Sequence, residues 1–123
     1  MTRTLHLGGK PVALERWRDA LLVLDVAGRL LWLDASGRVR RTLALGGHPD
    51  KLAVQGDAAY LTDRAGQVLK VNLARGALER RATFTHPMDV AALPGGHLAL
   101  ADGRGGVVML DADLKALERI GGS

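Results

Sequence analysis

The chain has 123 residues, the length of one typical domain, and its hydrophobic fraction of 47% with only 3% aromatics predicts a folded chain rather than a disordered one. The formal net charge of +4 is small and spread along the chain, so it gives little support to a nucleic-acid partner. No apolar run approaches the roughly 20 residues of a membrane-spanning helix, and no cysteine is present for a disulfide or a thiolate metal site. The first residues carry no secretory signal, so we expect a cytoplasmic protein without a membrane partner.

The sequence is organised by a repeat whose first two copies start 38 residues apart. Residues 4–11 (TLHLGGKP) recur at 42–49 (TLALGGHP) with six of eight positions identical, and the proline returns once more as Pro87. Three copies fill the single domain 1–123. We place them at about 10–45, 48–84 and 86–122, behind an additional N-terminal strand expected at 2–9.

Each copy carries four short apolar stretches separated by turn residues, which predicts an all-β fold built from antiparallel four-stranded meanders. Glycines at 56, 66 and 76 supply the backbone freedom that the turns of the middle copy need. Four strands in about 40 residues is the size of one β-propeller blade, and about four to eight such blades close around a channel. The expected strands are 12–17, 21–24, 30–34 and 39–45, then 51–55, 59–62, 68–73 and 77–84, and finally 89–93, 98–101, 107–111 and 116–120.

The middle copy carries a family resemblance. Its segment HPDKLAVQGDAAYLTD at 48–63, followed by VLKVNL at 68–73, resembles the YVTN and NHL type of propeller repeat. The resemblance extends over nearly the whole chain and implies the propeller fold. It implies little about activity, because this repeat occurs in binding modules, in scaffolds and in some enzymes.

Three blades cannot surround a channel, and an open arc would leave an apolar blade face in water at each end. If identical chains close the ring, six blades is the only multiple of three in the usual range, so we expect a homodimer joined through blade 1 to blade 3 contacts. Segment 3–9 aligns with the outermost strand at 41–47, so we expect it to pair with the partner's third blade. A longer propeller, or a different half-propeller partner, is the alternative.

Three residues at equivalent positions precede the prolines that open the innermost strands, Lys10, His48 and His86. In a dimer they would surround the channel mouth with four imidazoles and two ammonium groups, which makes them our candidates for ligand binding. Imidazole also binds metals, so His48 and His86 form an alternative metal site. No close metal-ligand motif is present, and we predict neither a metal nor another cofactor.

Two charged residues distinguish the first copy, because Glu15 and Arg16 stand where the second copy has Ala53 and Val54 and the third has Ala91 and Ala92. They would line a polar channel or form an ion pair at the junction between chains, and we favour the junction. Three aspartates recur after the second strand of each copy, Asp25, Asp63 and Asp102. They could form a ring of carboxylates, but we favour hydrogen bonds to turn amides.

Five arginines fall on the outermost strands, Arg38, Arg40, Arg41, Arg80 and Arg81. A basic rim could attract nucleic acid, but charged residues also protect exposed strand edges, and the scarcity of aromatics argues against a base-stacking surface. We therefore favour edge protection and expect no nucleic-acid partner.

The sequence lacks the signatures of common enzymes, since Ser36 lies in a turn and the GRGG segment at 103–106 opens no helix. We predict a non-enzymatic binding or scaffold protein that takes a protein or a small ligand at its loop face or channel. The alternative is a metal-assisted hydrolase or lyase of the six-bladed propeller type.

Overall fold

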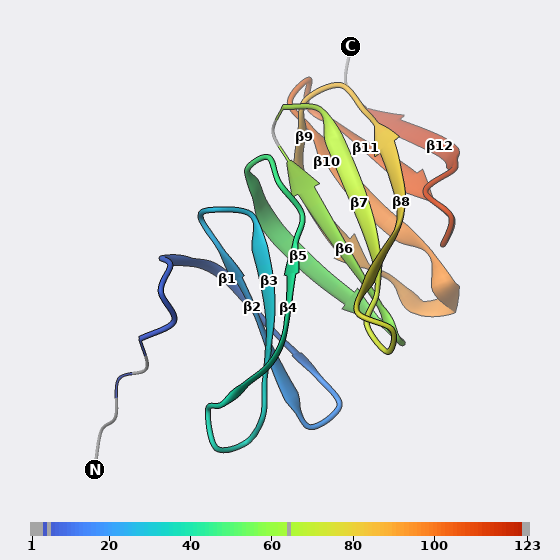
Figure 1. The fold of residues 1–123 in the computed structure, drawn as a ribbon. Coiled ribbons are helices and arrows are strands. Elements are labelled where there is room, and N and C mark those ends of the chain that lie inside the picture. Colours follow the sequence, from blue (N-terminus) through green and yellow to red (C-terminus); the bar gives the residue numbers. More distant parts are fainter. Residues whose placement is uncertain (1–3, 5, 64, 122–123) are drawn as a thin grey trace.

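The computed structural model describes residues 4, 6–63 and 65–121, and within these ranges the chain folds into three four-stranded antiparallel sheets that lie side by side in an arc (Figure 1). Blade 1 contains β1 (Pro11–Trp17), β2 (Ala20–Asp25), β3 (Arg29–Leu33) and β4 (Val39–Ala44). Blade 2 contains β5 (Pro49–Gln55), β6 (Ala58–Asp63), β7 (Gln67–Asn72) and β8 (Ala77–Thr83). Blade 3 contains β9 (Pro87–Ala92), the short 3₁₀ helix η1 (Pro94–Gly96), β10 (Leu98–Asp102), β11 (Gly106–Leu110) and β12 (Ala116–Gly121).

The predicted strands are confirmed, with boundaries that differ by at most two residues. Each innermost strand begins on its proline, because the first residue of an edge strand has no ladder partner for an N–H. The expected N-terminal strand is different: residues 4 and 6–9 belong to no strand of this chain, while residues 2, 3 and 5 lie outside the described ranges. Its pairing with a partner chain therefore stays a prediction.

Within each blade the strands follow one another in sequence order, as in a simple meander. Along the inner side of the arc, β5, the first strand of blade 2, contacts the first strands of both neighbouring blades, β1 and β9. The last strands, β4, β8 and β12, form the outer edges of the sheets. This arrangement is the propeller geometry expected from the repeat.

The core lies between the blades. Leu22, Leu24 and Trp32 of blade 1 pack against Leu61 and Leu69 of blade 2 in one buried cluster. A second cluster joins blade 2 to blade 3, and its members include Tyr60, Val68, Leu100, Val108 and Leu110. Because side chains alternate along a strand, each blade presents one apolar face to the blade before it and another to the blade after it.

Side-chain hydrogen bonds link adjacent blades at equivalent positions of the repeat. Trp17 donates from Nε1 to the carboxylate of Asp57 across the first junction, at 3.1 Å. Gln55, the equivalent residue of blade 2, donates to the carbonyl of Leu93 across the second junction, at 2.6 Å. Within the part of the chain that the structure describes, no helix is long and apolar enough to cross a membrane.

Candidate functional site

The three repeated aspartates hold the turn that follows the second strand of each blade. Asp25 accepts the backbone N–H groups of Ala27 and Arg29 at 3.0 and 2.9 Å. Asp102 accepts those of Arg104 and Gly106 at 2.9 and 3.0 Å. Asp63 accepts the N–H of Ala65 at 2.8 Å and that of His48 at 3.0 Å. The prediction of turn capping is confirmed, and the acceptor capacity of these carboxylates is used within the fold.

Two of these aspartates also pair with arginines. Burial acts to raise the pKa of Asp25, but hydrogen bonds from the backbone and the guanidinium of Arg29 outweigh it and hold the pKa below its ordinary value. The Arg29 Nε lies 2.6 Å from the Asp25 carboxylate. In blade 3 the backbone N–H of Gly106 and the ion pair with Arg119 lower the pKa of Asp102. Both carboxylates are thus ionised structural groups at neutral pH rather than proton donors.

The candidate channel-mouth residues Lys10, His48 and His86 lie at equivalent positions, one at the entrance to each innermost strand, and all three side chains are exposed. Their backbones are anchored by the turns described above. The Lys10 carbonyl accepts the N–H of Val26 at 2.7 Å, and the His86 carbonyl accepts that of Gly103 at 2.8 Å. His86 has a φ of 48°. Anchored backbones with exposed side chains are what a ligand-contacting position needs.

Around His48 the first interblade junction opens as a groove of about 370 Å³ at the channel-mouth end. Its lining residues are Val12, Val26, His48, Pro49, Asp50, Asp63 and Ala65. Neither Lys10 nor His86 lines it. In the described ranges, no group of three or more His, Asp or Glu side chains is close enough to hold a metal ion.

Glu15 and Arg16 lie on opposite faces of β1. Glu15 pairs in register with Leu22, which packs toward blade 2, and Arg16 pairs with Leu21 on the far face. Both side chains are exposed. Because neighbouring residues of a strand point in opposite directions, the two charges cannot act together at one junction. Arg16 lies where a partner chain would contact blade 1, whereas Glu15 faces the innermost strand of blade 2.

Three of the five rim arginines are tied to the fold. Arg41 donates to the carbonyl of Ala74 at 3.1 Å, and Arg40 pairs with Asp34 at 3.3 Å. Arg81 donates to the carbonyl of Leu45 at 3.3 Å. The rim is therefore not a row of free cations, which is consistent with the structural interpretation that we favoured.

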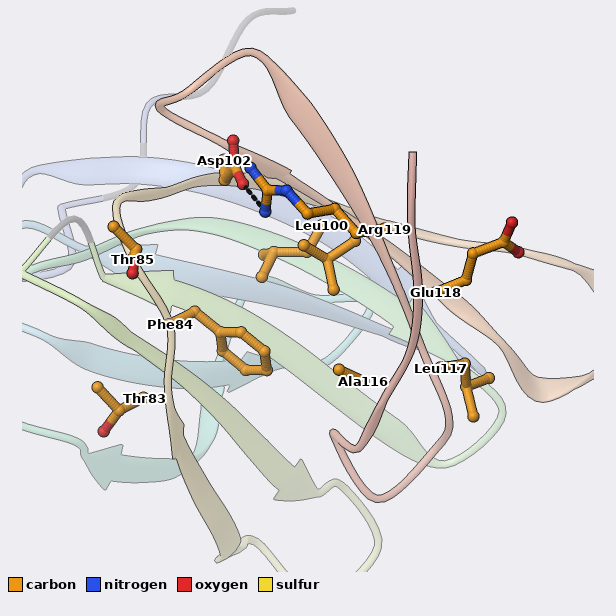
Figure 2. Close-up of a pocket in the computed structure, with 10 residues that line it drawn as sticks. Thr83, Phe84, Thr85, Leu100, Asp102, Ala116, Leu117, Glu118 and Arg119 are labelled. Atoms are coloured by element: carbon orange, nitrogen blue, oxygen red, sulfur yellow. Dashed lines mark ion pairs between the residues drawn. The ribbon is translucent and has the colours of Figure 1, made fainter. Parts of the chain in front are cut away.

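A cleft of about 470 Å³ separates the outer part of blade 2 from β12 of blade 3 (Figure 2). The ring of Phe84 projects into it toward Ala116, and the ion pair between Asp102 and Arg119 lies at one end. Leu45 holds the equivalent place at the first junction, where it is buried. No sequence motif predicts this cleft, and the signal that could have indicated it is the chain's single phenylalanine, Phe84.

The two ends of the arc expose apolar surface. On the far face of blade 1, Leu14 is 60% exposed and Leu21 is 39% exposed. On the far face of blade 3, Val107 is 37% exposed and Ile120 is 53% exposed. Three other apolar residues of the blade 1 end face, Val23, Leu31 and Leu33, are buried in contact with Leu7.

No family model matches the sequence, and no curated protein matches it. Solved structures do match. The RRP9 WD40 repeats superpose with a TM-score of 0.83 at 16% identity, over 96% of this chain and 40% of that chain. The Cps50 (Swd1) β-propeller domain of Myceliophteria thermophila gives 0.80 at 20% identity, over 97% and 41%. BamB from Moraxella catarrhalis gives 0.75 at 19% identity, over 89% and 34%.

At these identities the similarity shows the fold alone, which is that of β-propeller blades. The chain spans between a third and about two fifths of the length of the three matched chains. The matched chains include WD40 repeats and other propellers. The comparison therefore shows that the chain has the fold of propeller blades, but it does not show which type of propeller repeat the chain carries.

Proposed function

We propose that this chain is a non-enzymatic binding or scaffold module of the YVTN/NHL repeat type, which pairs with a second copy of itself to close a six-bladed ring. In this ring the end face of blade 1 packs on the end face of the partner's blade 3, and the same contact occurs twice. A protein or a small ligand then binds at the loop face or the channel.

The observation that carries the proposal is the exposure of apolar positions whose counterparts in blade 2 are buried. Leu21 is 39% exposed, while its counterpart Ala59 is 0% exposed. Val107 is 37% exposed, while its counterpart Val68 is 0% exposed. At both repeat positions the side chain is therefore buried in the middle blade and exposed to solvent in the end blade. A further blade packed on each end face would bury it.

The N-terminal segment supports the same closure. Leu7 packs against Val23 and Leu31 of blade 1 just as Leu45, its repeat counterpart, packs in the cluster that contains Leu61 of blade 2. Leu45 directly follows the outermost strand of the preceding blade. Leu7 thus occupies the place where the outermost strand of a preceding blade would end, which favours pairing of segment 2–9 with the partner's third blade.

The proposed binding surface is the channel-mouth end of the ring. A two-fold ring would present two copies each of Lys10, His48 and His86 around the channel. Imidazole and ammonium groups donate hydrogen bonds and, when charged, attract carboxylates and phosphates. These side chains are exposed on anchored backbones, which supports ligand contact rather than a role in the core.

The structural matches favour one alternative closure. Each reported match is to a chain more than twice as long as this one. The second candidate is therefore a ring in which these three blades are completed by blades of different sequence.

Light scattering on the purified chain, over a range of concentrations, tests the proposal. We expect a single species of 26.2 kDa, twice the 13.1 kDa of the chain. A well-folded monomer of 13.1 kDa would contradict the homodimeric ring. So would a chain that stays aggregated until it is purified together with a different protein.

A further inference from the structure

A second cleft lies between blades 1 and 2, at the hairpin tips opposite the channel mouth. It has a volume of about 430 Å³, within the range of pockets that hold small ligands or a few peptide side chains. Its walls come from β1, β3 and β4 of blade 1 and from Leu73 and Ala74 of blade 2. Since both walls belong to one chain, the cleft exists whether or not the ring closes.

Both tryptophans of the chain, Trp17 and Trp32, line this cleft. Trp17 uses its N–H in the hydrogen bond to Asp57. Trp32 is only 4% exposed, yet its Nε1 has no hydrogen-bond partner. A buried donor left without a partner destabilises a fold, because it has lost its hydrogen bond to water. A ligand oxygen would remove this penalty at Trp32.

A fixed cation lies beside this donor. The guanidinium of Arg41 lies 5.7 Å from the centre of the Trp32 ring. Its hydrogen-bond partners in the structure are the carbonyls of Leu73 and Ala74, which carry no charge to compensate it. The side chain runs across Gly76, where any Cβ would collide with it. Arg41 is thus held in place rather than free to swing into solvent.

The other charges around the cleft limit what can enter. Arg40 is paired with Asp34 at 3.3 Å, and Arg18 is paired with Asp57 at 2.8 Å. Asp19, the remaining lining carboxylate, is in the exposed turn between β1 and β2. With Asp19 and Asp34 in the wall, a polyanion would be repelled, so a ligand that pairs with Arg41 is expected to carry a single carboxylate.

We propose that this cleft binds a peptide segment in which a carboxylate stands beside an apolar side chain. The carboxylate accepts hydrogen bonds from Arg41 and from Nε1 of Trp32, and the apolar side chain contacts the tryptophan rings. This assignment adds a partner class to the proposed binding role, but it does not depend on ring closure.

Intrinsic fluorescence is a direct probe, because the only two tryptophans of the chain are in the cleft. The probes are the peptide acetyl-Leu-Glu-Leu-amide and its neutral match acetyl-Leu-Gln-Leu-amide. We expect a saturable change with the Glu peptide and at least tenfold weaker binding of the Gln peptide. Equal binding of the two peptides, or no saturable change with either, would overturn the proposal.

Variants locate the effect. Trp32→Phe keeps an aromatic ring but removes the donor, and Arg41→Gln removes the charge; each should weaken the Glu peptide about tenfold or more, with Trp17 still reporting in the first. Arg80→Gln, an exposed arginine on the outer strand of blade 2, is the matched control and should leave binding unchanged. A loss in Arg80→Gln equal to that in Arg41→Gln would show a general charge effect and refute the cleft.

Two further arms separate the remaining outcomes. If 4-methylpentanoate binds as tightly as the Glu peptide, the site takes a free carboxylic acid and the peptide assignment is wrong. Molecular mass is measured on the same samples, so a monomer that still binds the Glu peptide would refute the ring and keep the cleft. Asp19→Asn, which removes the nearby negative charge, should tighten binding of the Glu peptide.

Discussion

Ring closure can be tested by placing opposite charges on the two end faces. Leu14 lies on the far face of β1, and Ala91 lies near the middle of the far face of β9. The innermost strands of adjacent blades contact each other at both junctions within the chain. We therefore expect β1 of one chain to face β9 of the other, so that Leu14→Lys and Ala91→Glu introduce charges on the two sides of the same contact.

The loss from Leu14→Lys can be worked from the exposed surface. Full burial of a leucine side chain is worth about 1.5–3 kcal/mol. Leu14 is 60% exposed in the single chain, so covering it in the ring contributes about 1–2 kcal/mol. The contact occurs twice per ring, so losing it weakens dimerisation by about 2–4 kcal/mol, or about 30- to 900-fold, before the desolvation of the lysine is added.

Sedimentation velocity over a concentration series measures this change. Leu117→Lys is the control, because Leu117 is similarly exposed, at 54%, but lines the cleft of Figure 2 rather than an end face. We expect monomers for Leu14→Lys and for Ala91→Glu, and an unchanged dimer for Leu117→Lys. Both end-face variants should keep the thermal stability of a folded monomer.

Mixing the two end-face variants gives the decisive result. In a mixed ring, Lys at position 14 of one chain faces Glu at position 91 of the other, and the second contact is wild type. Each variant alone would place two unpaired charges at its contacts. We expect a heterodimer to form only on mixing. If the mixture stays monomeric while each variant is folded, or if each variant still dimerises alone, the head-to-tail arrangement is refuted.

Two further predictions concern the fold. Asp25 has a lowered pKa in the folded chain, so its stabilising effect is present above the ordinary aspartate pKa of about 3.9 and is lost as the pH falls through the folded value. In thermal unfolding, Asp25→Asn should therefore be less stable than wild type at pH 7 and less sensitive to acid. Identical pH profiles for the two proteins would contradict the role of Arg29. Gly76→Ala should lower the melting temperature more than Gly95→Ala. Both glycines have a positive φ, but only at position 76 would the new Cβ collide with Arg41. Equal losses in melting temperature would show that backbone strain alone accounts for the effect.

The sequence predicted the architecture well because the repeat places the same turn chemistry at the same spacing. Pro49 and Pro87 mark where the innermost strands begin, and Asp63 and Asp102 mark where the second strands end. Each of these residues acts on its own turn or strand, so its effect can be predicted from local sequence. The interblade packing follows from alternation along the strands.

The cleft around Trp32 could not be found in this way, because it depends on residues that differ between blades. The counterpart of Trp32 in blade 2 is Lys70, which pairs with Glu79 and Asp113, each at 3.5 Å. Blade 1 thus has tryptophan at two positions where blade 2 has other residues, Trp32 in place of Lys70 and Trp17 in place of Gln55. Both tryptophans lie at the same junction. The signal was present as two tryptophans in an otherwise aromatic-poor chain, but only the structure brings them together.

The two charged residues of blade 1 lie on opposite faces of β1, because neighbouring residues of a strand point in opposite directions. An ion pair at the junction between chains would therefore involve Arg16, which lies on the end face, and not Glu15. Whether Arg16 forms this pair stays a prediction.

The two end faces differ in a way that favours a head-to-tail contact over one between like faces. The far face of blade 1 exposes the large side chains Leu14 and Leu21, whereas the far face of blade 3 carries Ala91, Ala99 and Ala101 beside Val107, Met109 and Ile120. Large side chains on one side and small ones on the other can interdigitate, but two leucine-rich faces would hold each other apart. A head-to-tail contact either closes after a fixed number of copies or continues as an open filament. Closure at two copies requires each blade to turn the arc by about 60°, as in rings of six blades. A series of oligomers of increasing mass, rather than a single dimer, would therefore indicate that the two end faces are complementary but that the angle between successive blades differs from about 60°.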